Sequence, residues 1–352
     1  MEKINVCVLF GGVSSEHSVS EVSASAVLDA INREKYNVFP VGITEDGRWL
    51  LYGGETDRIR NHCWEDGSTV PVVLSPDRTD KSMIKLDGGK CEKIRIDVVY
   101  PMLHGKNGED GTIQGLCTLA DIPCVGSGVL GSAVCMDKCI AKMLFEKAEI
   151  PQARWVEMRL GGSLDFERVE RELGYPCFIK PSSAGSSVGV TKAANRSELE
   201  EGVKLAFRHD YKVLIEEAID AREIECGVMG NLEPVVADAF GEIMPAKEFY
   251  DFEAKYEDEA SKVIIPADLS DEVQKKLRDY AMRAYKICEC RGYSRVDFFI
   301  DRRDGRIILN EINTLPGFTP ISMYPKLWDY SGVPMSELID RHIEYAMSRT
   351  DK

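Results

Sequence analysis

Residues 295–313 read RVDFFIDRRDGRIILNEIN, two apolar runs separated by a short charged segment. This pattern is typical of a β-hairpin, and a three-residue loop at 303–305 would let Gly305 adopt the left-handed conformation that such loops need. Counting back from that loop along both strands places Asp297 directly opposite Glu311. A two-residue loop would instead turn Asp297 to the other face of the sheet. The loop length therefore decides which side chains meet.

The three-residue loop predicts a site for a divalent cation. Residues two apart in a strand face the same way, so Glu311 and Asn313 present a carboxylate and an amide oxygen side by side. With Asp297 opposite, they form a set of three oxygen donors of the kind that Mg²⁺ shares with phosphate and water. The alternative is a solvated edge hairpin. The apolar runs VDFFI and IILNEI on either side of the carboxylates favour the cation site.

The composition limits the classes of function. A chain of 352 residues is longer than one ordinary core, which favours two or three domains. Its net charge of −15 gives no general attraction to phosphate backbones or anionic lipid, so we expect no nucleic-acid or membrane partner.

No apolar run reaches the roughly 18 residues of a membrane span, and the opening run is too short for a secretion signal. We therefore expect a cytoplasmic protein, with its eleven scattered cysteines as buried thiols.

The first part of the chain predicts an α/β domain. Strands alternate with helices over residues 1–126, which favours an open, largely parallel sheet. The polar segment 48–93 is interpreted as a surface elaboration of this domain. Ser18 and Glu21 match a capping box for the first helix, and Glu16 lies just ahead of it.

Two further units follow. Residues 127–217 predict a smaller α+β unit with an antiparallel sheet, and its first helix is expected to run unbroken over 134–148. Residues 218–352 predict a third unit, which contains the hairpin and a loop at about 244–262.

Two segments have the composition of ligand-binding loops. KPSSAGSSVG, residues 180–189, follows an apolar strand, and its glycines and hydroxyls would let a phosphate approach the backbone, with Lys180 as a point charge. It does not match a P-loop, and a flexible hairpin loop is the alternative. His104 follows another strand, where open α/β sheets bind ligands, although a lone histidine is more often structural.

A third segment has the composition of a functional loop. Residues 244–256, MPAKEFYDFEAKY, crowd aromatic and cationic side chains among carboxylates without a clear period. A purely structural loop rarely needs Phe249, Tyr250, Phe252, Lys255 and Tyr256 together. A surface loop with a small apolar cluster is the alternative.

These motifs, taken in order, resemble a known family. GGVSSEHSVS, LHGKNGEDGTIQG, MDK, IKPSSAGSSVGV, FYDFEAKY, RVDFF and NEINTLPGFTPISMYP closely resemble the D-alanine–D-alanine ligases of the ATP-grasp superfamily. The resemblance extends from about residue 4 to residue 345. It implies three α/β domains, ATP held between the central and C-terminal ones, two Mg²⁺ ions with Mn²⁺ as an alternative, and a homodimer.

The resemblance also implies a reaction. ATP would phosphorylate the carboxylate of a first D-alanine, and the amine of a second D-alanine would attack the acyl phosphate. The products would be ADP, phosphate and D-alanyl-D-alanine, a precursor for the peptidoglycan that sets cell-wall strength and cell shape.

The roles of individual residues follow from the same resemblance. Glu16 would bind the ammonium group of the first D-alanine and connect to Ser186 and Tyr256, while Arg295 and the Gly317 N–H would face the developing oxyanion. The remaining expected contacts are His104 at the first substrate, Ser322 at the second carboxylate, Lys255 at the transferring phosphate, Lys138 and Lys180 at the ATP phosphates, Glu216 and Glu223 at adenine and ribose, and Asp297, Glu311 and Asn313 at the cations.

One position departs from the family pattern, and three alternatives remain. Some members carry Lys where this chain has Glu217, which puts a side-chain contact to ATP at that point in doubt. A relative that joins D-alanine to D-lactate or D-serine is the nearest alternative, although FYDFEAKY and Met323 favour D-alanine. A dinucleotide oxidoreductase would need a third glycine after VCVLFGG, and a catalytically silent relative would be expected to lose a metal ligand or Arg295.

Overall fold

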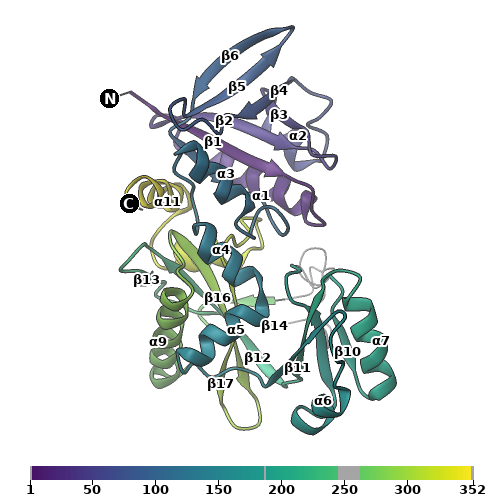
Figure 1. Cartoon of the computed structure of the whole chain (residues 1–352). Coiled ribbons are helices and arrows are strands. Elements are labelled where there is room, and N and C mark those ends of the chain that lie inside the picture. The colour runs from purple at the N-terminus through teal and green to yellow at the C-terminus, as the bar shows by residue number, and fades with distance from the viewer. Residues whose placement is uncertain (1, 186–187, 245–261, 350–352) are drawn as a thin grey trace.

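The computed structural model describes residues 2–185, 188–244 and 262–349, and three β-sheets organise them (Figure 1). The first sheet has the strand order β6-β5-β4-β3-β2-β1-β7. Its strands are β1 (Ile4–Gly11), β2 (Tyr36–Ile43), β3 (Trp49–Tyr52), β4 (Thr69–Leu74), β5 (Ser82–Asp87), β6 (Lys90–Arg95) and β7 (Val98–Pro101).

This first sheet is mixed rather than largely parallel. The central strand β1 pairs in parallel with β2 and β7, as predicted from the apolar runs at these positions. The segment 48–93, however, is not a surface elaboration, because its short apolar runs form β3 to β6 and extend the sheet in antiparallel fashion. Short loops join β2 to β3, β4 to β5 and β5 to β6, and such loops allow only antiparallel neighbours. The longer segment between β3 and β4 contains a helix, and these two strands are also antiparallel.

Helix α1 (His17–Ala30) begins earlier than the capping box predicts. Glu16 occupies the N-cap position without a side-chain capping bond, and Ser20 and Glu21 lie inside the helix. Their side chains instead make tertiary contacts: Ser20 Oγ accepts a hydrogen bond of 2.8 Å from the Gly11 N–H. The other helices of this region are α2 (Thr56–Arg60) and α3 (Thr112–Ala120).

The second sheet is antiparallel, as predicted, with the order β10-β9-β11-β8. Its elements are α4 (Val129–Met136), α5 (Lys138–Lys147), β8 (Trp155–Arg159), α6 (Phe166–Glu172), β9 (Cys177–Pro181), β10 (Thr191–Ala193), α7 (Arg196–Ala206) and β11 (Lys212–Glu217). The single helix expected over 134–148 is wrong. Asp137 is extended and accepts a hydrogen bond from the Ile140 N–H, so it ends α4 and caps α5.

The third sheet contains the hairpin, in the order β15-β14-β12-β16-β17 with β13 paired to β12. Its elements are β12 (Ala221–Met229), β13 (Val235–Val236), β14 (Gly241–Met244), β15 (Lys262–Ile264), α9 (Asp271–Ile287), β16 (Tyr293–Asp301), β17 (Ile307–Asn313), α10 (Met323–Tyr330) and α11 (Met335–Met347).

The hairpin pairs Asp297 with Glu311, as predicted, but not through the predicted loop. The Asp301 N–H donates to the Arg306 carbonyl at 3.0 Å, so the loop has four residues, 302–305. A β-bulge between Asp297 and Phe298 shifts the register by one residue and restores the pairing. The predicted three-residue loop was therefore wrong. The β-bulge, rather than the loop length, brings Asp297 to the same face as Glu311.

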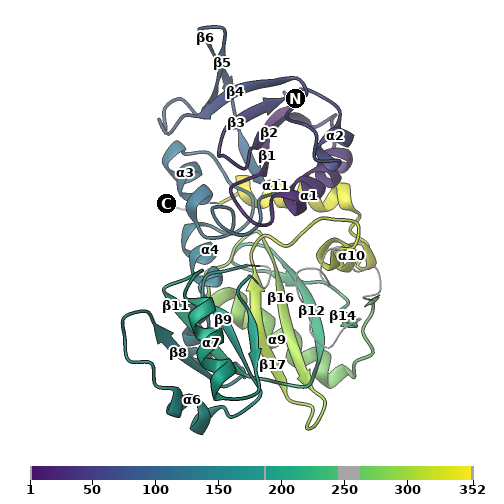
Figure 2. The same ribbon diagram turned by 90° about the vertical axis from the view of Figure 1, so that its right-hand side faces the viewer.

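The C-terminal helix connects the third sheet to the first. Helix α11 lies against the N-terminal sheet, beside α1 and β7 (Figure 2). One apolar core accordingly contains Val6 and Val8 of β1 together with Leu338, Ile339 and Ile343 of α11. All eleven cysteines are free thiols, and eight are buried as expected; Cys63 and Cys124 are partly exposed and Cys91 is exposed.

Close packing around β2 leads to a stability prediction. A Cβ added at Gly42 would stand 2.2–2.6 Å from three ring atoms of Trp64, which itself packs edge-on against Phe10 with ring centroids 4.9 Å apart. We expect Gly42→Ala to lower the free energy of unfolding by about 1–3 kcal/mol through overpacking, measured by urea denaturation. Gly53→Ala is the matched control, because its nearest neighbour atom would lie at 3.5 Å. Equal stability of the two variants would contradict the packing account.

Candidate active site

The floor of the site is a row of carboxylates across three neighbouring strands. Glu225 of β12 pairs with Asp297 of β16, which in turn pairs with Glu311 of β17. One pleat further along, Arg295 pairs with Asn313. All of these side chains face the same side of the sheet because residues two apart in a strand share a face.

Arg295 lies between two of these carboxylates. Its Nε and Nη2 donate to the two oxygens of Asp297 at 2.8 Å each, and Nε lies 3.1 Å from Oε2 of Glu225. Both carboxylates are almost completely buried, with side-chain exposures of 3% and 6%. This guanidinium stabilises two buried negative charges that would otherwise repel each other.

Three lysines approach the row from helix α5 and strand β9. Lys138 Nζ donates to the Ala184 carbonyl at 2.9 Å and lies 3.7 Å from Oε2 of Glu311. Lys142 and Lys180 each place Nζ 2.6 Å from one oxygen of Glu216. The break at Asp137 puts Lys138 in the first turn of α5, and Lys142 follows one helical turn later on the same face.

The Glu216 carboxylate compensates the positive charges of the two buried lysines, Lys142 and Lys180. Burial on its own raises the pKa of Glu216, but the charges of Lys142 and Lys180 outweigh it and hold this pKa at about 2. Burial likewise lowers the pKa of Lys180, and Glu216 more than compensates, so the net shift is upward. Glu311 and Glu223 contribute to the same upward shift, which places Glu223 near this cluster.

The serine-rich loop closes one side of the site. The Ser182 carbonyl accepts a hydrogen bond of 2.9 Å from the Lys138 N–H, which connects the loop to the start of α5. Ser186 of this loop lies outside the described residues. Lys255 and Tyr256 of the loop at about 244–262 lie outside them as well.

Glu16 brings the N-terminal domain to the same place. It is 5% exposed, and its Oε2 lies 2.5 Å and 2.8 Å from where a Cβ would stand on Gly105 and Gly185. The carboxylate therefore fits between two backbone segments that only glycine allows. From the other side, Glu109 Oε2 accepts a hydrogen bond of 2.8 Å from the Gly105 N–H. Burial, and secondly the Glu16 carboxylate, raise the pKa of Glu109 well above its ordinary value.

His104 connects this region to the loop after β17. Its Nδ1 lies 3.1 Å from the Leu315 carbonyl, which can only accept, so Nδ1 carries the hydrogen. Its Nε2, without a hydrogen, accepts from the Ser23 hydroxyl at 3.0 Å, and Ser23 Oγ in turn accepts from the Phe318 N–H at 3.2 Å. Burial lowers the pKa of His104 to about 4, so the ring is neutral near pH 7.

The same loop places Gly317 beside Ser322. A Cβ on Gly317 would stand 2.9 Å from Ser322 Oγ, so the backbone N–H and the hydroxyl share one small region. Ser322 Oγ accepts from the Thr319 N–H at 3.0 Å, and Asn313 Oδ1 accepts from the Leu315 N–H at 3.2 Å. Asn313 thus holds the loop at its start and Ser322 at its end.

Glu217 turns away from this cluster. Its carboxylate accepts from the Arg154 N–H at 2.9 Å and from Arg154 Nε at 2.7 Å. Arg154 thus engages the Glu217 carboxylate, and the doubt about a side-chain contact to ATP at this position stays a prediction.

Three residues of the site were missed from the sequence: Lys142, Glu225 and Glu109. Lys142 stands four positions after Lys138 in the otherwise apolar run CIAKMLF, and this helical spacing was the available signal. Glu225 alternates with Glu223 along β12, so it also carried a signal. Glu109 had none beyond its place in the GEDG turn.

Comparison with known proteins identifies the family. The D-ala D-ala ligase N-terminus matches residues 5–127, and the D-ala D-ala ligase C-terminus matches residues 144–344. The chain belongs to the D-alanine–D-alanine ligase family. The predicted family and its ATP-grasp α/β fold are thus confirmed, and this family consists of ATP-dependent ligases.

Individual relatives cover the full chain. The D-alanine–D-alanine ligase of Clostridium acetobutylicum is 50% identical over 99% of both chains. The VanG D-Ala:D-Ser ligase of Enterococcus faecalis is 40% identical over 98% of this chain and 100% of its own, with a TM-score of 0.90. The D-alanine-D-alanine ligase of Coxiella burnetii is 34% identical over 99% of this chain and 95% of its own, with a TM-score of 0.88. Across the described ranges, no helix is long and apolar enough to cross a membrane.

The lysine cluster predicts a pH-dependent loss of stability in Glu216→Gln. We expect a loss of about 3–5 kcal/mol at pH 7, because two buried lysines lose their partner. Since the pKa of Glu216 is depressed to about 2, the wild-type advantage is fully present above the ordinary carboxyl pKa and declines as the pH falls toward 2. Urea denaturation at pH 7, 4.5 and 3 measures it. Adding Lys142→Met to Glu216→Gln should restore part of the lost stability. If Glu216→Gln alone is as stable as wild type at pH 7, the proposed charge compensation is wrong.

Proposed function

We propose that this protein joins two D-alanines to D-alanyl-D-alanine with consumption of ATP, for peptidoglycan precursor synthesis. The observation that carries the proposal is the meeting of three elements: the carboxylate row on the third sheet, the lysines of α5 and β9, and the buried carboxylate of Glu16. The first two suit the phosphates of ATP with their counter-charges, and the third suits an ammonium group. The three sheets support the proposed domains 1–126, 127–217 and 218–352.

In the first step, a carboxylate oxygen of D-alanine attacks the γ-phosphorus of ATP, and the bond to the β–γ bridging oxygen breaks. Lys138 and Lys180 are proposed to hold the phosphates, with Lys255 at the transferring group and Glu216 and Glu223 toward adenine and ribose. Glu216 has a further role, because it fixes Lys180 in a charged and oriented state. In-line positioning of this kind supplies much of the rate of phosphoryl transfer.

In the second step, the amine nitrogen of the other D-alanine attacks the acyl carbon, and phosphate leaves as the ammonium loses its proton. Glu16, supported by Ser186 and Tyr256, is proposed to hold the first ammonium, with His104 beside that substrate. Arg295 and the Gly317 N–H are proposed to stabilise the oxyanion, since preorganised donors lower such barriers strongly. Ser322 is proposed to bind the second carboxylate, beside the Gly317 N–H.

Asp297, Glu311 and Asn313 fit the two Mg²⁺ ions of the proposal, for which Mn²⁺ is an alternative. The donors are hard oxygens, and the row carries three carboxylates against two cationic side chains, Arg295 and Lys138. Bound there, the ions would neutralise charge on the transferring phosphate.

D-alanine is favoured over D-serine or D-lactate as the second substrate. Met323, adjacent to Ser322, is 3% exposed, and its sulfur lies 2.1 Å from where a Cβ would stand on Gly241. This apolar side chain is held tightly next to the proposed second carboxylate site. Curated relatives at 49–50% identity also bear the D-alanine–D-alanine ligase name, so the mixed-ligase alternative is not favoured.

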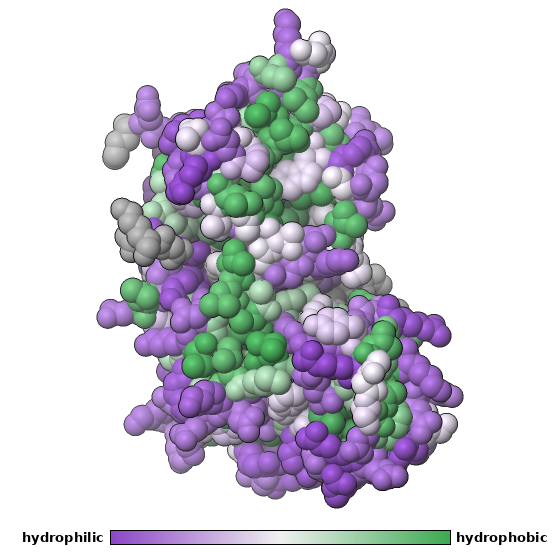
Figure 3. Space-filling view, in the orientation of Figure 1, coloured by the Kyte–Doolittle hydropathy of each residue, from purple (hydrophilic) through white to green (hydrophobic). Residues whose placement is uncertain are grey.

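We also propose that the protein is a cytoplasmic homodimer that pairs through α3 and α4. Residues 112–136 contain one charged residue in a chain that is 29% charged. Leu119, Val129 and Leu130 are exposed by 66%, 44% and 61%, and apolar surface covers this part of the molecule in Figure 3. Two copies with a charge of −15 each repel over most of their surface, so a face with a single charged residue is where a second copy fits.

The activity is tested by phosphate release from Mg-ATP with D-alanine, L-alanine, or D-alanine mixed with D-serine or D-lactate, with products identified by mass. We expect release with D-alanine alone and formation of D-alanyl-D-alanine. Glu311→Gln should lower kcat at least about 100-fold, because it removes an oxygen donor and a partner of Lys138. Asp304→Asn, an exposed carboxylate in the turn of the same hairpin, is the matched control. Turnover only with mixed pairs would overturn the substrate assignment.

The dimer is tested by light scattering after size exclusion. Leu130→Glu should convert the dimer to a monomer of 39.3 kDa, because each symmetric interface then buries two unpaired charges. Leu160→Glu places the same charge at a leucine of equal exposure, 62%, outside the proposed face and should remain dimeric. A dimer that survives Leu130→Glu would place the interface elsewhere.

A further inference from the structure

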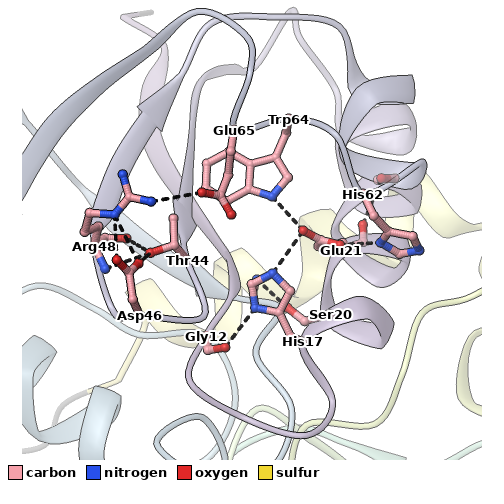
Figure 4. A network of polar contacts seen from close by, with 12 residues as sticks. Gly12, His17, Ser20, Glu21, Thr44, Asp46, Arg48, His62, Trp64 and Glu65 are labelled. Carbon is pink, nitrogen blue, oxygen red and sulfur yellow. Dashed lines mark hydrogen bonds and ion pairs between the residues drawn. The ribbon is translucent and has the colours of Figure 1, made fainter.

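The loop that carries Glu16 is attached to the fold by His17. This loop, residues 12–16, connects β1 to α1. His17 Nδ1 lies 2.8 Å from the Gly12 carbonyl at the start of the loop, and Nε2 lies 3.1 Å from Oε1 of Glu21 one turn further along α1 (Figure 4). The ring thus bridges the loop and the helix from the position next to Glu16.

Both partners of the His17 ring are hydrogen-bond acceptors. A carbonyl oxygen can only accept, and an ionised carboxylate can only accept, so both ring nitrogens must carry a hydrogen. This geometry requires the imidazolium form of His17. The pair is largely shielded from solvent, since the His17 side chain is 11% exposed and the Glu21 side chain 3%. The hydrogen bond to Glu21 raises the pKa of His17, and this effect exceeds the opposing effect of burial.

The carboxylate of Glu21 is itself held rigidly. Trp64 Nε1 donates to its Oε1 at 2.6 Å, and His62 Nδ1 contacts its Oε2 (Figure 4). Trp64 cannot move easily, because it is packed against Phe10 and directly over Gly42. The charged groups that face His17 are Glu21 of its own helix and Glu45 from the loop after β2, both of which favour the charged ring.

The start of the loop has no room to adjust. A Cβ on Gly11 would stand 2.3 Å from the Ile43 carbonyl and 2.9 Å from Cε1 of His17. Ser20 Oγ holds the Gly11 N–H and also donates to the Met102 carbonyl. With Gly11 and Gly12 both attached to α1, the placement of Glu16 between Gly105 and Gly185 follows from the geometry of the loop.

We propose that the His17 imidazolium, clamped between the Gly12 carbonyl and Glu21, is a positioning residue that sets the Glu16 carboxylate for the ammonium group of the first D-alanine. The inference rests on the proposed function for its substrate. In this proposal His17 touches no substrate and acts on Glu16 through the loop 12–16. It also makes D-alanine affinity dependent on the charge of His17.

The sign of the pH dependence follows from the two donors. The clamp is complete while His17 is charged, below its ordinary pKa, and one donor is lost as the pH rises through the raised pKa in the folded protein. The KM for D-alanine should therefore increase toward alkaline pH. An arginine at this position keeps its charge and several donors, so His17→Arg should show a smaller alkaline increase than wild type under identical substrate titration.

The kinetic test compares His17→Gln, His17→Arg and Glu21→Gln with wild type between pH 6 and 9.5. We expect His17→Gln to raise the KM for D-alanine about 10-fold or more at pH 7 with a smaller change in kcat, since misplacement of a binding group is costly. His17→Arg should restore most of the affinity. His62→Gln is the matched control, because it removes the other imidazole that contacts Glu21 and leaves the contact of His17 to the Gly12 carbonyl in place. An unchanged KM in His17→Gln would overturn the proposal.

A substrate-free measurement separates this inference from the proposed function. The chain has five histidines, so ¹⁵N-histidine spectra can be assigned with the His17→Gln variant. We expect both nitrogens of His17 to be protonated at pH 7 and the ring to titrate above 6.5, moving downward in Glu21→Gln. A neutral His17 at pH 7 would overturn the proposal even in an active ligase. A charged His17 in a protein without ligase activity would instead refute the function.

Discussion

Burial of charge is the constraint on which the site depends. Glu225, Asp297 and Glu311 stand side by side across three strands; the first two are almost fully buried and Glu311 is 30% exposed. Neighbouring like charges of this kind need compensating cations close by. Arg295 supplies one such cation from the same sheet, and Lys138 supplies another from α5. Three features of the fold place these charges. The hairpin register sets Asp297 opposite Glu311, and the break between α4 and α5 puts Lys138 near Glu311. Strand β9 of the second sheet brings Lys180 to Glu216. The proposed binding of ATP uses the same arrangement. The negative phosphates would face the lysines, and the positive metal ions would face the carboxylates, so the net charge of the site would change little.

A second buried polar group joins β7 of the first sheet to helices α10 and α11. His342 of α11 is 0% exposed, and its ring nitrogens contact the hydroxyls of Tyr100 at 2.7 Å and Tyr324 at 3.1 Å. The ring stacks on Tyr293 with centroids 4.1 Å apart, and burial lowers the pKa of His342 to about 3, so it is a neutral bridge. This contact holds β7 of the first sheet to helix α10. The loop between β17 and α10, which carries Gly317, is thereby kept beside His104.

The sequence predicted much of this arrangement, and its errors were local. The pairing of Asp297 with Glu311 followed from alternation along two strands, which is a property of the chain itself. The loop length was wrong, because a β-bulge depends on strain and packing that no local pattern records. Ser18 and Glu21 match a capping box, yet Glu21 is used by His17, His62 and Trp64, partners that are distant in sequence except for His17. A tertiary network took precedence over a local motif.

What the sequence determined on its own was the set of chemical groups and their local periodicity: the oxygen donors of the hairpin, the lysine of the serine-rich loop, the histidine after β7 and the family to which these motifs belong. Only the tertiary structure decided which charges meet. Lys142 and Lys180 converge on Glu216 from a helix and a strand, and Glu16 reaches Gly185 from the loop between β1 and α1. The physical reason is that short-range periodicity sets the face on which a side chain lies. The partner that compensates a buried charge is instead selected by the packing of whole elements against one another.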